Sequence, residues 1–177
     1  MGITAKWVID PTHSEVQFKI KHLVITTVTG QFTEFSGEVT YSDDFSDLQA
    51  SFEAKVDSIS TNNDTRDGHL KSEDFFAAAQ YPTINFISTS VTKKEDNSFV
   101  LNGDLTIRGV SKPISLDVEY GGTVVDPYGQ TKAGFEINGK INRKDFGLTW
   151  SAVTEAGGAV VSDDVRLIAN IQLVKQA

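Results

Sequence analysis

Apolar and polar side chains alternate along much of this 177-residue chain, and the alternation restricts what the chain can fold into. In residues 48–56 every second residue is apolar: Leu48, Ala50, Phe52, Ala54 and Val56. Successive side chains of a β-strand point to opposite faces, so a period of two is typical of an antiparallel strand with one buried and one solvated face. The sequence therefore predicts a strand here and not a helix.

Strand-like segments recur along the whole chain, separated by clusters of Gly, Asn, Asp and Ser. They cover residues 16–20, 84–91, 99–107, 114–120, 133–141 and 165–173. Together with residues 48–56 they predict an all-β, antiparallel fold of about eight strands. Regular short strands with little helix are typical of a β-sandwich or a closed β-barrel, and the alternation alone does not distinguish the two.

Residues 60–80 depart from this pattern. They lose the alternation and contain residues that cap helices, and Tyr81-Pro82 then ends the segment. We expect a loop with a short helical segment near residues 63–80. No Pro-rich linker, shift in composition or repeat divides the chain, so the sequence predicts a single domain over residues 1–177.

Two glycines interrupt apolar faces and favour a barrel with space inside. Gly103 is in phase with Leu101 and Leu105, and Gly139 is in phase with Ile137. A glycine that points inward marks a bend or the close approach of another group, or leaves volume for a ligand. Asn102-Gly103 and Asn138-Gly139 could instead be two-residue hairpin turns, which would shorten the strands.

The charge and the cysteine content exclude several classes of function. Lys and Arg number 16 against 24 Asp and Glu, so the formal charge is -8 and the field of the whole protein repels phosphate backbones and anionic lipid surfaces. We therefore expect no nucleic-acid binding. The absence of cysteine excludes disulfides, thiolate nucleophiles and Fe–S clusters. No stretch reaches the ~20 apolar residues of a membrane-spanning helix, so we expect no integral membrane segment.

The first ten residues contain no apolar run as long as that of a signal peptide. We expect a cytoplasmic protein for the chain as it stands. A chain from which a signal peptide had already been removed would be periplasmic instead.

The residues that could support catalysis or metal binding are few and scattered. His13 follows a turn-like start, His22 is in phase with the apolar face of the first long strand, and His69 lies in the polar segment. This spacing fits no metal motif, and no Gly-x-Ser-x-Gly elbow is present. Adjacent carboxylates such as Asp43-Asp44 would point to opposite faces of a strand. We expect no catalytic residue and no metal site.

Phe is the most abundant aromatic residue, with eleven Phe against four Tyr and two Trp. Phe contributes apolar area without a hydrogen-bonding group, which suits either a dry core or a surface that holds hydrocarbon.

Separated blocks of this sequence resemble a known protein family. They are WVIDPTHSEVQFKIKH (7–22), GQFTEFSG (30–37), RDGHLKSEDFF (66–76), YPTINF (81–86), GDLTIRG (103–109), NRKDFGLTW (142–150) and DVRL (164–167). In this order they resemble the YceI-like family, whose members have an extended lipocalin-like barrel and are described as polyisoprenoid-binding. The resemblance implies a barrel, and it favours strands over hairpins at Gly103 and Gly139.

The resemblance also implies a function. We expect a lipid-binding protein, not an enzyme, that holds a long polyisoprenoid, such as an isoprenoid quinone, for storage or transport, with no required cofactor. The family allows a homodimer, and many of its members are exported with a signal. The expected ligand-binding residues are Phe18, Ile20, His22, Phe52, Phe86, Leu101, Leu105, Phe135, Ile137 and Trp150.

Two ion pairs are expected to fix loops at the barrel mouth, namely Arg66 with Asp67 and Arg143 with Asp145. The alternative is that these residues contact the head group of a ligand.

One rival function is an enzyme that uses His22 with a carboxylate across the barrel. The other is an interaction module with a filled core, which would lack a cavity of about 300 Å³ or more.

Overall fold

The computed structural model describes residues 4–23, 25–42, 45–148 and 161–176. Its strands are β1 (Ala5–Ile9), β2 (Glu15–His22), β3 (Thr26–Phe32), β4 (Phe35–Tyr41), β5 (Gln49–Lys55), β6 (Ile59–Ser60), β7 (Thr83–Glu95), β8 (Ser98–Ile107), β9 (Val110–Val125), β10 (Thr131–Asn142) and β11 (Val161–Lys175). The helix α1 spans Asp64–Lys71, and short 3₁₀ turns cover η1 (Pro11–His13), η2 (Val56–Ser58) and η3 (Arg143–Phe146).

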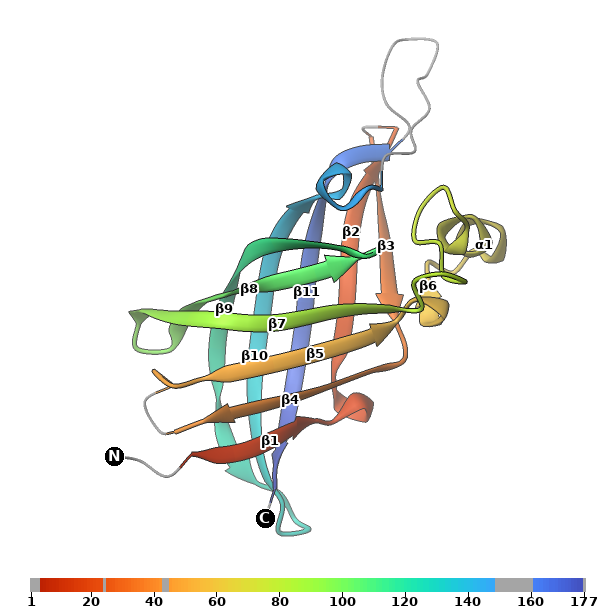
Figure 1. Cartoon of the computed structure of the whole chain (residues 1–177). Helices are drawn as coiled ribbons and strands as arrows, with labels where there is room; N and C mark the ends of the chain where they lie inside the picture. Colours follow the sequence, from red (N-terminus) through yellow and green to blue (C-terminus); the bar gives the residue numbers. More distant parts are fainter. Residues whose placement is uncertain (1–3, 24, 43–44, 149–160, 177) are drawn as a thin grey trace.

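The strands form an antiparallel sheet that closes on itself (Figure 1). β1 pairs with β4 on one side and with β11 on the other, and this closes a barrel in the order β1-β4-β5-β7-β8-β9-β10-β11. β2, β3 and β6 extend the sheet from β11 beyond this ring. The prediction of an antiparallel barrel of eight strands is confirmed, and the structure adds three strands to it.

β11 is long enough to pair with two different strands along one edge. Its residues Leu173–Lys175 pair with β1, and its earlier residues pair with β2. The turn η1 separates β1 from β2, and its N-cap Asp10 accepts a hydrogen bond from the backbone N–H of Thr12 at 3.1 Å. Pro11 at the first position of the turn suits this geometry because it has no N–H to satisfy. Because of this turn, β1 and β2 pair with successive parts of the same edge of β11.

The segment without alternation contains the helix, as predicted. Asn63 caps α1 by accepting a hydrogen bond from the N–H of Arg66 at 2.9 Å, which satisfies one of the free donors of the first turn. The helix ends at Lys71, and residues 73–80 continue as turns. In Figure 1 the helix lies beside β6, next to the strands that extend the barrel.

The inward glycines accommodate neighbouring side chains. Gly103 lies within β8 and Gly139 within β10, so the hairpin alternative is wrong. A Cβ atom at Gly103 would lie 2.4 Å from Cζ of Phe86, and one at Gly139 would lie 2.5 Å from Cδ2 of Leu116. The carbonyl oxygen of Ile87 also lies 2.6 Å from such an atom at Gly103 and cannot move aside, whereas the end of the Leu116 side chain could rotate away from Gly139. In both places a neighbouring side chain occupies the volume that the glycine leaves.

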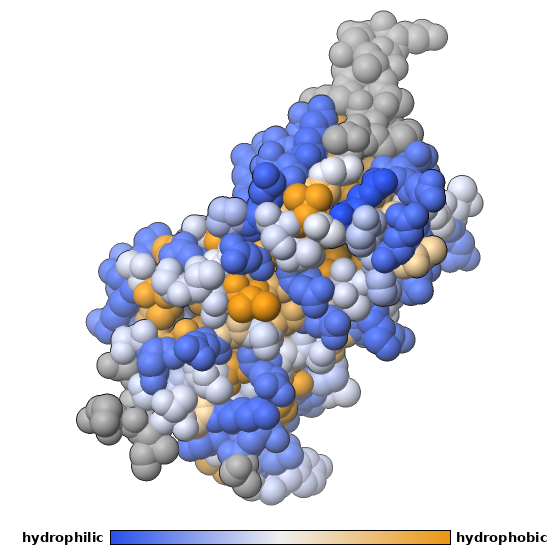
Figure 2. All heavy atoms as spheres, viewed as in Figure 1, coloured by the Kyte–Doolittle hydropathy of each residue, from blue (hydrophilic) through white to orange (hydrophobic). Residues whose placement is uncertain are grey.

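The outer surface is mixed in character. Figure 2 shows small apolar areas among hydrophilic residues on one face of the molecule. Among the helices that the structure describes, none is both long and apolar enough to cross a bilayer.

Candidate functional site: an apolar cavity in the barrel

A cavity of about 380 Å³ occupies part of the barrel interior. Most of its wall consists of aliphatic and phenyl side chains from the barrel strands and from β2 and β3. Among the barrel residues that line it are Ile9, Val39, Ala50, Phe52, Ile84, Phe86, Leu101, Leu105, Ile114, Leu116, Ile137, Ile141, Val165, Leu167, Ala169 and Ile171. A cavity of this volume excludes a fully packed interior, so the observation that would have favoured the filled-core module is not met.

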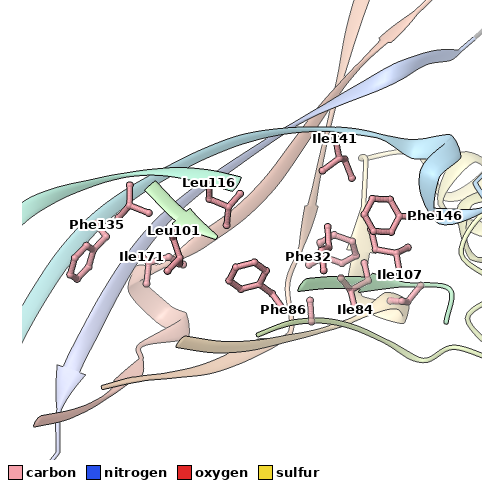
Figure 3. Packing of buried hydrophobic residues seen from close by; sticks show 14 of the residues in the cluster. Phe32, Ile84, Phe86, Leu101, Ile107, Leu116, Phe135, Ile141, Phe146 and Ile171 are labelled. Carbon is pink, nitrogen blue, oxygen red and sulfur yellow. The ribbon is translucent and has the colours of Figure 1, made fainter. Parts of the chain in front are cut away.

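The strands β2 and β3, which extend the sheet beyond the barrel, and the segment that contains α1 also contribute to the cavity wall. Phe18 and Ile20 from β2 and Val28 and Phe32 from β3 contribute to it. The segment after β6 adds Thr61, Arg66, His69, Leu70, Phe75 and Phe76. Figure 3 shows Phe32, Ile84, Ile107 and Phe146 close together at this end of the row of buried side chains. The extra strands therefore enlarge the apolar interior of the barrel.

Thr61 forms hydrogen bonds with two charged residues on or next to the cavity wall. Arg66 donates from Nε to Oγ1 of Thr61 at 2.7 Å and from a terminal nitrogen to its carbonyl oxygen at 2.8 Å. Asp67, which is buried, accepts from the N–H and the hydroxyl of Thr61 at 2.8 and 2.6 Å. The expected Arg66–Asp67 ion pair is wrong: both side chains instead bind the residue between β6 and α1.

Arg143 is the most buried charged residue of the wall, with 2% of its surface exposed. It begins η3 and donates to the carbonyl oxygens of Ser162 at 2.9 Å and Leu148 at 2.6 Å. Its ion pair is with Asp163 at 3.8 Å, not with Asp145 as expected from the sequence. Burial lowers the pKa of Arg143, and Asp163 opposes that shift. Carbonyl oxygens thus hold this cation at the junction of η3 and β11.

His69 lies on the wall near the end of α1. Its Nε2 is 2.8 Å from a carboxylate oxygen of Asp74, and its ring meets the ring of Phe75 edge-on at 5.1 Å. These contacts hold the segment after α1 against the cavity. No cluster of three or more His, Asp or Glu suited to a metal ion occurs within the described ranges.

Aromatic rings fill the other half of the barrel. We call this set the aromatic cluster, and it consists of Trp7, Tyr41, Phe45, Phe99, Tyr120 and Phe135. Phe45, from the connection between β4 and β5, lies at its centre, with ring centroids 4.7 Å from Tyr41 and 5.0 Å from Tyr120. None of these six residues lines the cavity. The cluster therefore ends the cavity on one side.

The structure places seven of the ten expected ligand-binding residues on the cavity wall. They are Phe18, Ile20, Phe52, Phe86, Leu101, Leu105 and Ile137. Phe135 belongs instead to the aromatic cluster and lies at the opposite end of the row in Figure 3 from Phe146. Trp150 and the side chain of His22 lie outside the described part of the structure. The enzyme that would use His22 therefore remains a hypothesis, and so does ligand binding by the seven wall residues.

Sequence reasoning missed several wall residues. They are Val28 and Phe32 on β3, Leu70 in α1, and Phe75 and Phe76 in the turns after α1. The alternation of Val28, Gly30 and Phe32 was a usable signal, but the glycine obscures it. A Cβ atom at Gly30 would lie 2.2 Å from Cζ of Phe18, so this glycine gives space to the ring of the neighbouring strand.

The comparison with known families matches the YceI-like domain over residues 7–173, which is nearly the whole chain. The chain belongs to the YceI-like family. A UPF0312 protein of Staphylococcus aureus is 38% identical over 165 residues, a match that covers 92% of this chain and 94% of the relative. The expected resemblance is thereby confirmed for this YceI-like protein.

Solved structures share the fold of this YceI-like protein. The YceI protein of Campylobacter jejuni has a TM-score of 0.77 and 36% identity, and the match covers 95% of this chain and 96% of the other. A polyisoprenoid-binding domain from Saccharophagus degradans, implicated in plant cell wall breakdown, has a TM-score of 0.67 and 17% identity, with 96% and 98% of the chains covered. At that identity the second likeness shows the fold alone.

Proposed function

We propose that this YceI-like protein binds the hydrocarbon chain of a polyisoprenoid lipid in the cavity and so shields it from water. The single observation that carries the proposal is the cavity itself, whose wall is almost wholly aliphatic and aromatic over both the barrel strands and β2 and β3. The polyisoprenoid-binding domain of Saccharophagus degradans, which has the same fold, supports this class of ligand. The proposed role is storage or transport, and an isoprenoid quinone is one ligand of this class.

The hydrophobic effect is sufficient to drive such binding. Removing apolar surface from water contributes ~25 cal/mol per Å², so a few hundred Å² of buried chain contributes roughly 5 to 10 kcal/mol before the loss of ligand freedom is subtracted. Micromolar or tighter binding therefore requires no charged contact.

The two arginines of the wall favour a neutral chain over a charged ligand in the cavity. Arg66 makes two hydrogen bonds to Thr61, and Arg143 binds carbonyl oxygens and Asp163. These contacts explain both arginines as parts of the protein structure. A ligand that paired with either one would have to compete with bonds that already exist.

The first test is to identify what the protein carries. Protein purified from its native host is extracted with organic solvent, and the extract is analysed by mass spectrometry. We expect a long-chain prenyl lipid in a stoichiometric amount. Protein from several hosts that yields no lipid, and that takes up no added prenyl compound, would contradict the proposal.

The second test fills the cavity. Ala169 of β11 lines the cavity, so Ala169→Phe should reduce prenyl-lipid uptake at least about tenfold by taking the volume that the chain needs. The matched control is Asn170→Phe, which places the same ring on the exposed face of the same strand. Folding of both variants is checked by circular dichroism. Equal uptake by the two variants would place the lipid elsewhere.

A further inference from the structure

Two hydrogen-bond donors in the barrel interior have no partner among the residues that the structure describes. They are the indole Nε1 of Trp7 and the hydroxyl of Tyr41. Trp7 is 4% exposed and Tyr41 is 6% exposed, so both side chains are removed from solvent. Buried polar groups in proteins nearly always have a partner, and an unpaired one lowers stability. Two such groups side by side therefore require an explanation.

The two donors lie where the cavity meets the aromatic cluster. Trp7 pairs across β1 and β4 with Val39, and Tyr41 is the next residue after Val39 on the same face of β4. Ile9, the next inward residue after Trp7 on β1, and Val39 both line the cavity. The ring centroids of Trp7 and Tyr41 are 5.2 Å apart with an interplanar angle of 8°, so the two side chains are stacked. The cavity therefore ends beside a pair of stacked rings that carry unused donors.

Phe45 packs against Tyr41 at this place. Its ring centroid is 4.7 Å from that of Tyr41, and its backbone has φ of 60°, which is rare for a large aromatic residue. Phe45 is also partly exposed, because it belongs to the connection between β4 and β5 and not to a strand. A side chain held in a costly backbone conformation beside Tyr41 can be displaced at a lower cost than one in a relaxed strand.

We propose that Trp7 and Tyr41 form a polar subsite at the end of the cavity that meets the aromatic cluster, and that this subsite binds a neutral oxygen of the ligand, such as a ketone, quinone, ester or ether oxygen. The indole group can only donate, and the hydroxyl can donate, so the matching ligand atom is an acceptor. Displacement of Phe45 makes room for that atom. The inference rests on the proposed function, because it concerns the end of the same lipid that lies in the cavity.

The surroundings of the subsite select a neutral ligand group. Burial raises the pKa of Tyr41 well above its ordinary value, and the nearby Tyr120 contributes to the shift, so the hydroxyl keeps its proton. The rings around the donors provide no cation to balance a carboxylate or a phosphate, because Phe45, Phe99 and Phe135 are all apolar. A buried ionised group without a partner is strongly disfavoured, whereas a carbonyl oxygen needs only a donor.

The test compares two probes of matched length. One is farnesylacetone, a prenyl methyl ketone of about 18 carbon atoms, and the other is the prenyl hydrocarbon of the same length, which lacks the oxygen. Affinity is measured by displacement of a fluorescent apolar dye from the wild-type protein and from Tyr41→Phe. We expect the wild type to prefer the ketone by about five- to tenfold, as one or two buried hydrogen bonds provide. The variant should lose that preference and retain its affinity for the hydrocarbon.

Two readouts besides affinity check the same claim. Ligand-free Tyr41→Phe should be at least as stable as the wild type in thermal unfolding, because the substitution removes a buried hydroxyl that has no partner. In ¹⁵N-labelled protein the indole N–H signal of Trp7, identified by its loss in Trp7→Phe, should move downfield when the ketone is added and not when the hydrocarbon is added.

The outcomes separate the two proposals. If the wild type binds neither probe, the proposed function fails and the subsite fails with it. If the wild type binds both probes equally and Tyr41→Phe changes nothing, the lipid-binding function stands and the subsite is refuted. A marked loss of stability in ligand-free Tyr41→Phe would also refute the subsite, because the hydroxyl would then already have a partner inside the folded protein.

Discussion

The half of the barrel that holds the aromatic cluster and the half that holds the cavity are built from the same strands. On β10, Phe135 and Ile137 are two residues apart and point to the same face, yet the ring of Phe135 packs against Tyr120 and Phe45 while Ile137 lines the cavity. The strands alone do not make this difference. Phe45, from the connection between β4 and β5, packs at the centre of the rings of one half, whereas Phe75 and Phe76, which also come from outside the strands, line the cavity in the other half. The comparison shows that rings from outside the strands can either fill the barrel interior, as Phe45 does, or line its cavity, as Phe75 and Phe76 do.

Among these substitutions, removal of the buried guanidinium group of Arg143 should have the largest effect on stability. Arg143→Met removes a buried cation that donates to the carbonyl oxygens of Ser162 and Leu148, and leaves those acceptors without it. We expect a loss of about 3 to 5 kcal/mol in the free energy of unfolding, measured by urea titration. The control Arg166→Met removes an exposed cation from β11 and should change stability by less than about 0.5 kcal/mol. Similar losses in the two variants would show that the buried contacts contribute little.

Truncation of one ring in each half tests the comparison directly. Phe135 is 7% exposed and packs against other rings, so Phe135→Ala should lower the free energy of unfolding by about 3 to 4 kcal/mol. Phe52 is half-buried and faces the cavity, so it has fewer contacts to lose, and Phe52→Ala should cost about 1 to 2 kcal/mol. Chemical denaturation of both variants measures the difference. Equal losses would mean that the cavity wall is packed as tightly as the aromatic cluster.

Added volume should have the opposite consequence in the two halves. Ala133 is 1% exposed and does not line the cavity, so Ala133→Leu overpacks its surroundings and should cost about 2 kcal/mol. Ala169 faces the cavity, so Ala169→Leu has room and should change stability by less than about 0.5 kcal/mol. Thermal unfolding of the ligand-free variants checks the order. A larger loss from Ala169→Leu would contradict an open space beside β11.

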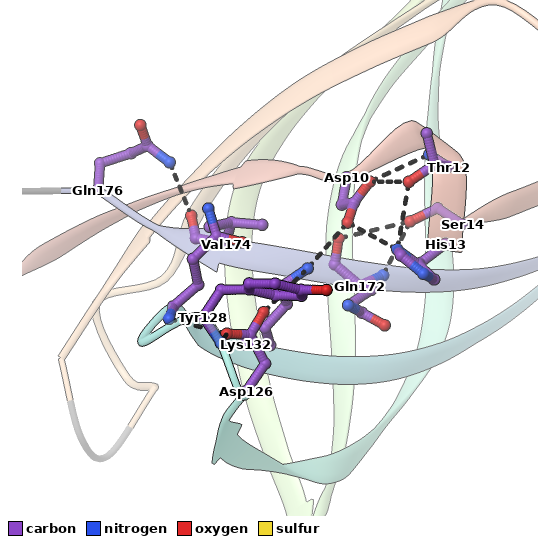
Figure 4. Close-up of polar contacts among 11 residues, drawn as sticks. Asp10, Thr12, His13, Ser14, Asp126, Tyr128, Lys132, Gln172, Val174 and Gln176 are labelled. Carbon is purple, nitrogen blue, oxygen red and sulfur yellow. Dashed lines mark hydrogen bonds and ion pairs between the residues drawn. The ribbon is translucent and has the colours of Figure 1, made fainter.

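Acid should weaken the half that holds the aromatic cluster by a smaller amount. Asp10, at the end of β1, binds Nζ of Lys132 on β10 at 3.1 Å and the hydroxyl of Thr12 at 2.7 Å (Figure 4). Hydrogen bonds from Thr12 and His13, together with Lys132, hold the pKa of Asp10 well below its ordinary value of 3.8. A carboxyl with a lowered pKa in the folded state contributes stability above the pKa of the unfolded chain, and this contribution is lost as the pH falls below about 4.

The variant Asp10→Asn isolates this contribution. It should be less stable than the wild type by roughly 1 to 2 kcal/mol at pH 7, and the difference should shrink as the pH is lowered from about 4 towards 2. Urea midpoints at a series of pH values measure it. A difference that stays constant over this range would show that the Asp10 charge does not stabilise the junction of β1 and β10.

Much of the fold follows from local pattern. The alternation in residues 48–56 and 165–173 corresponds to β5 and β11, and the loss of alternation after Ser60 corresponds to α1. The register of β3 and β4 was harder to recognise, because Gly30 and Gly37 occupy inward positions where an apolar residue would have completed the pattern. Each of these glycines is required by a neighbouring side chain: Phe18 for Gly30 and Ile9 for Gly37.

The candidate site was less predictable than the fold. Phe52 and Phe86 could be placed inside the barrel by their period, but Phe135 has the same period and lies outside the cavity. The partners of the charged residues were also beyond local reasoning. Arg143 is two residues from Asp145, yet it pairs with Asp163 of β11, which the fold brings to it.

The sequence by itself determined which side chains face inward, because the period of a strand is a property of the backbone and needs no knowledge of the neighbouring strands. Only the tertiary structure decided how far along the barrel each inward side chain lies, since that depends on the register of eight strands at once. The same register sets Trp7 beside Tyr41, and the connection between β4 and β5 brings Phe45 against Tyr41. For that reason the position of the cavity, and the unpaired donors at its end, could be found only in the folded chain.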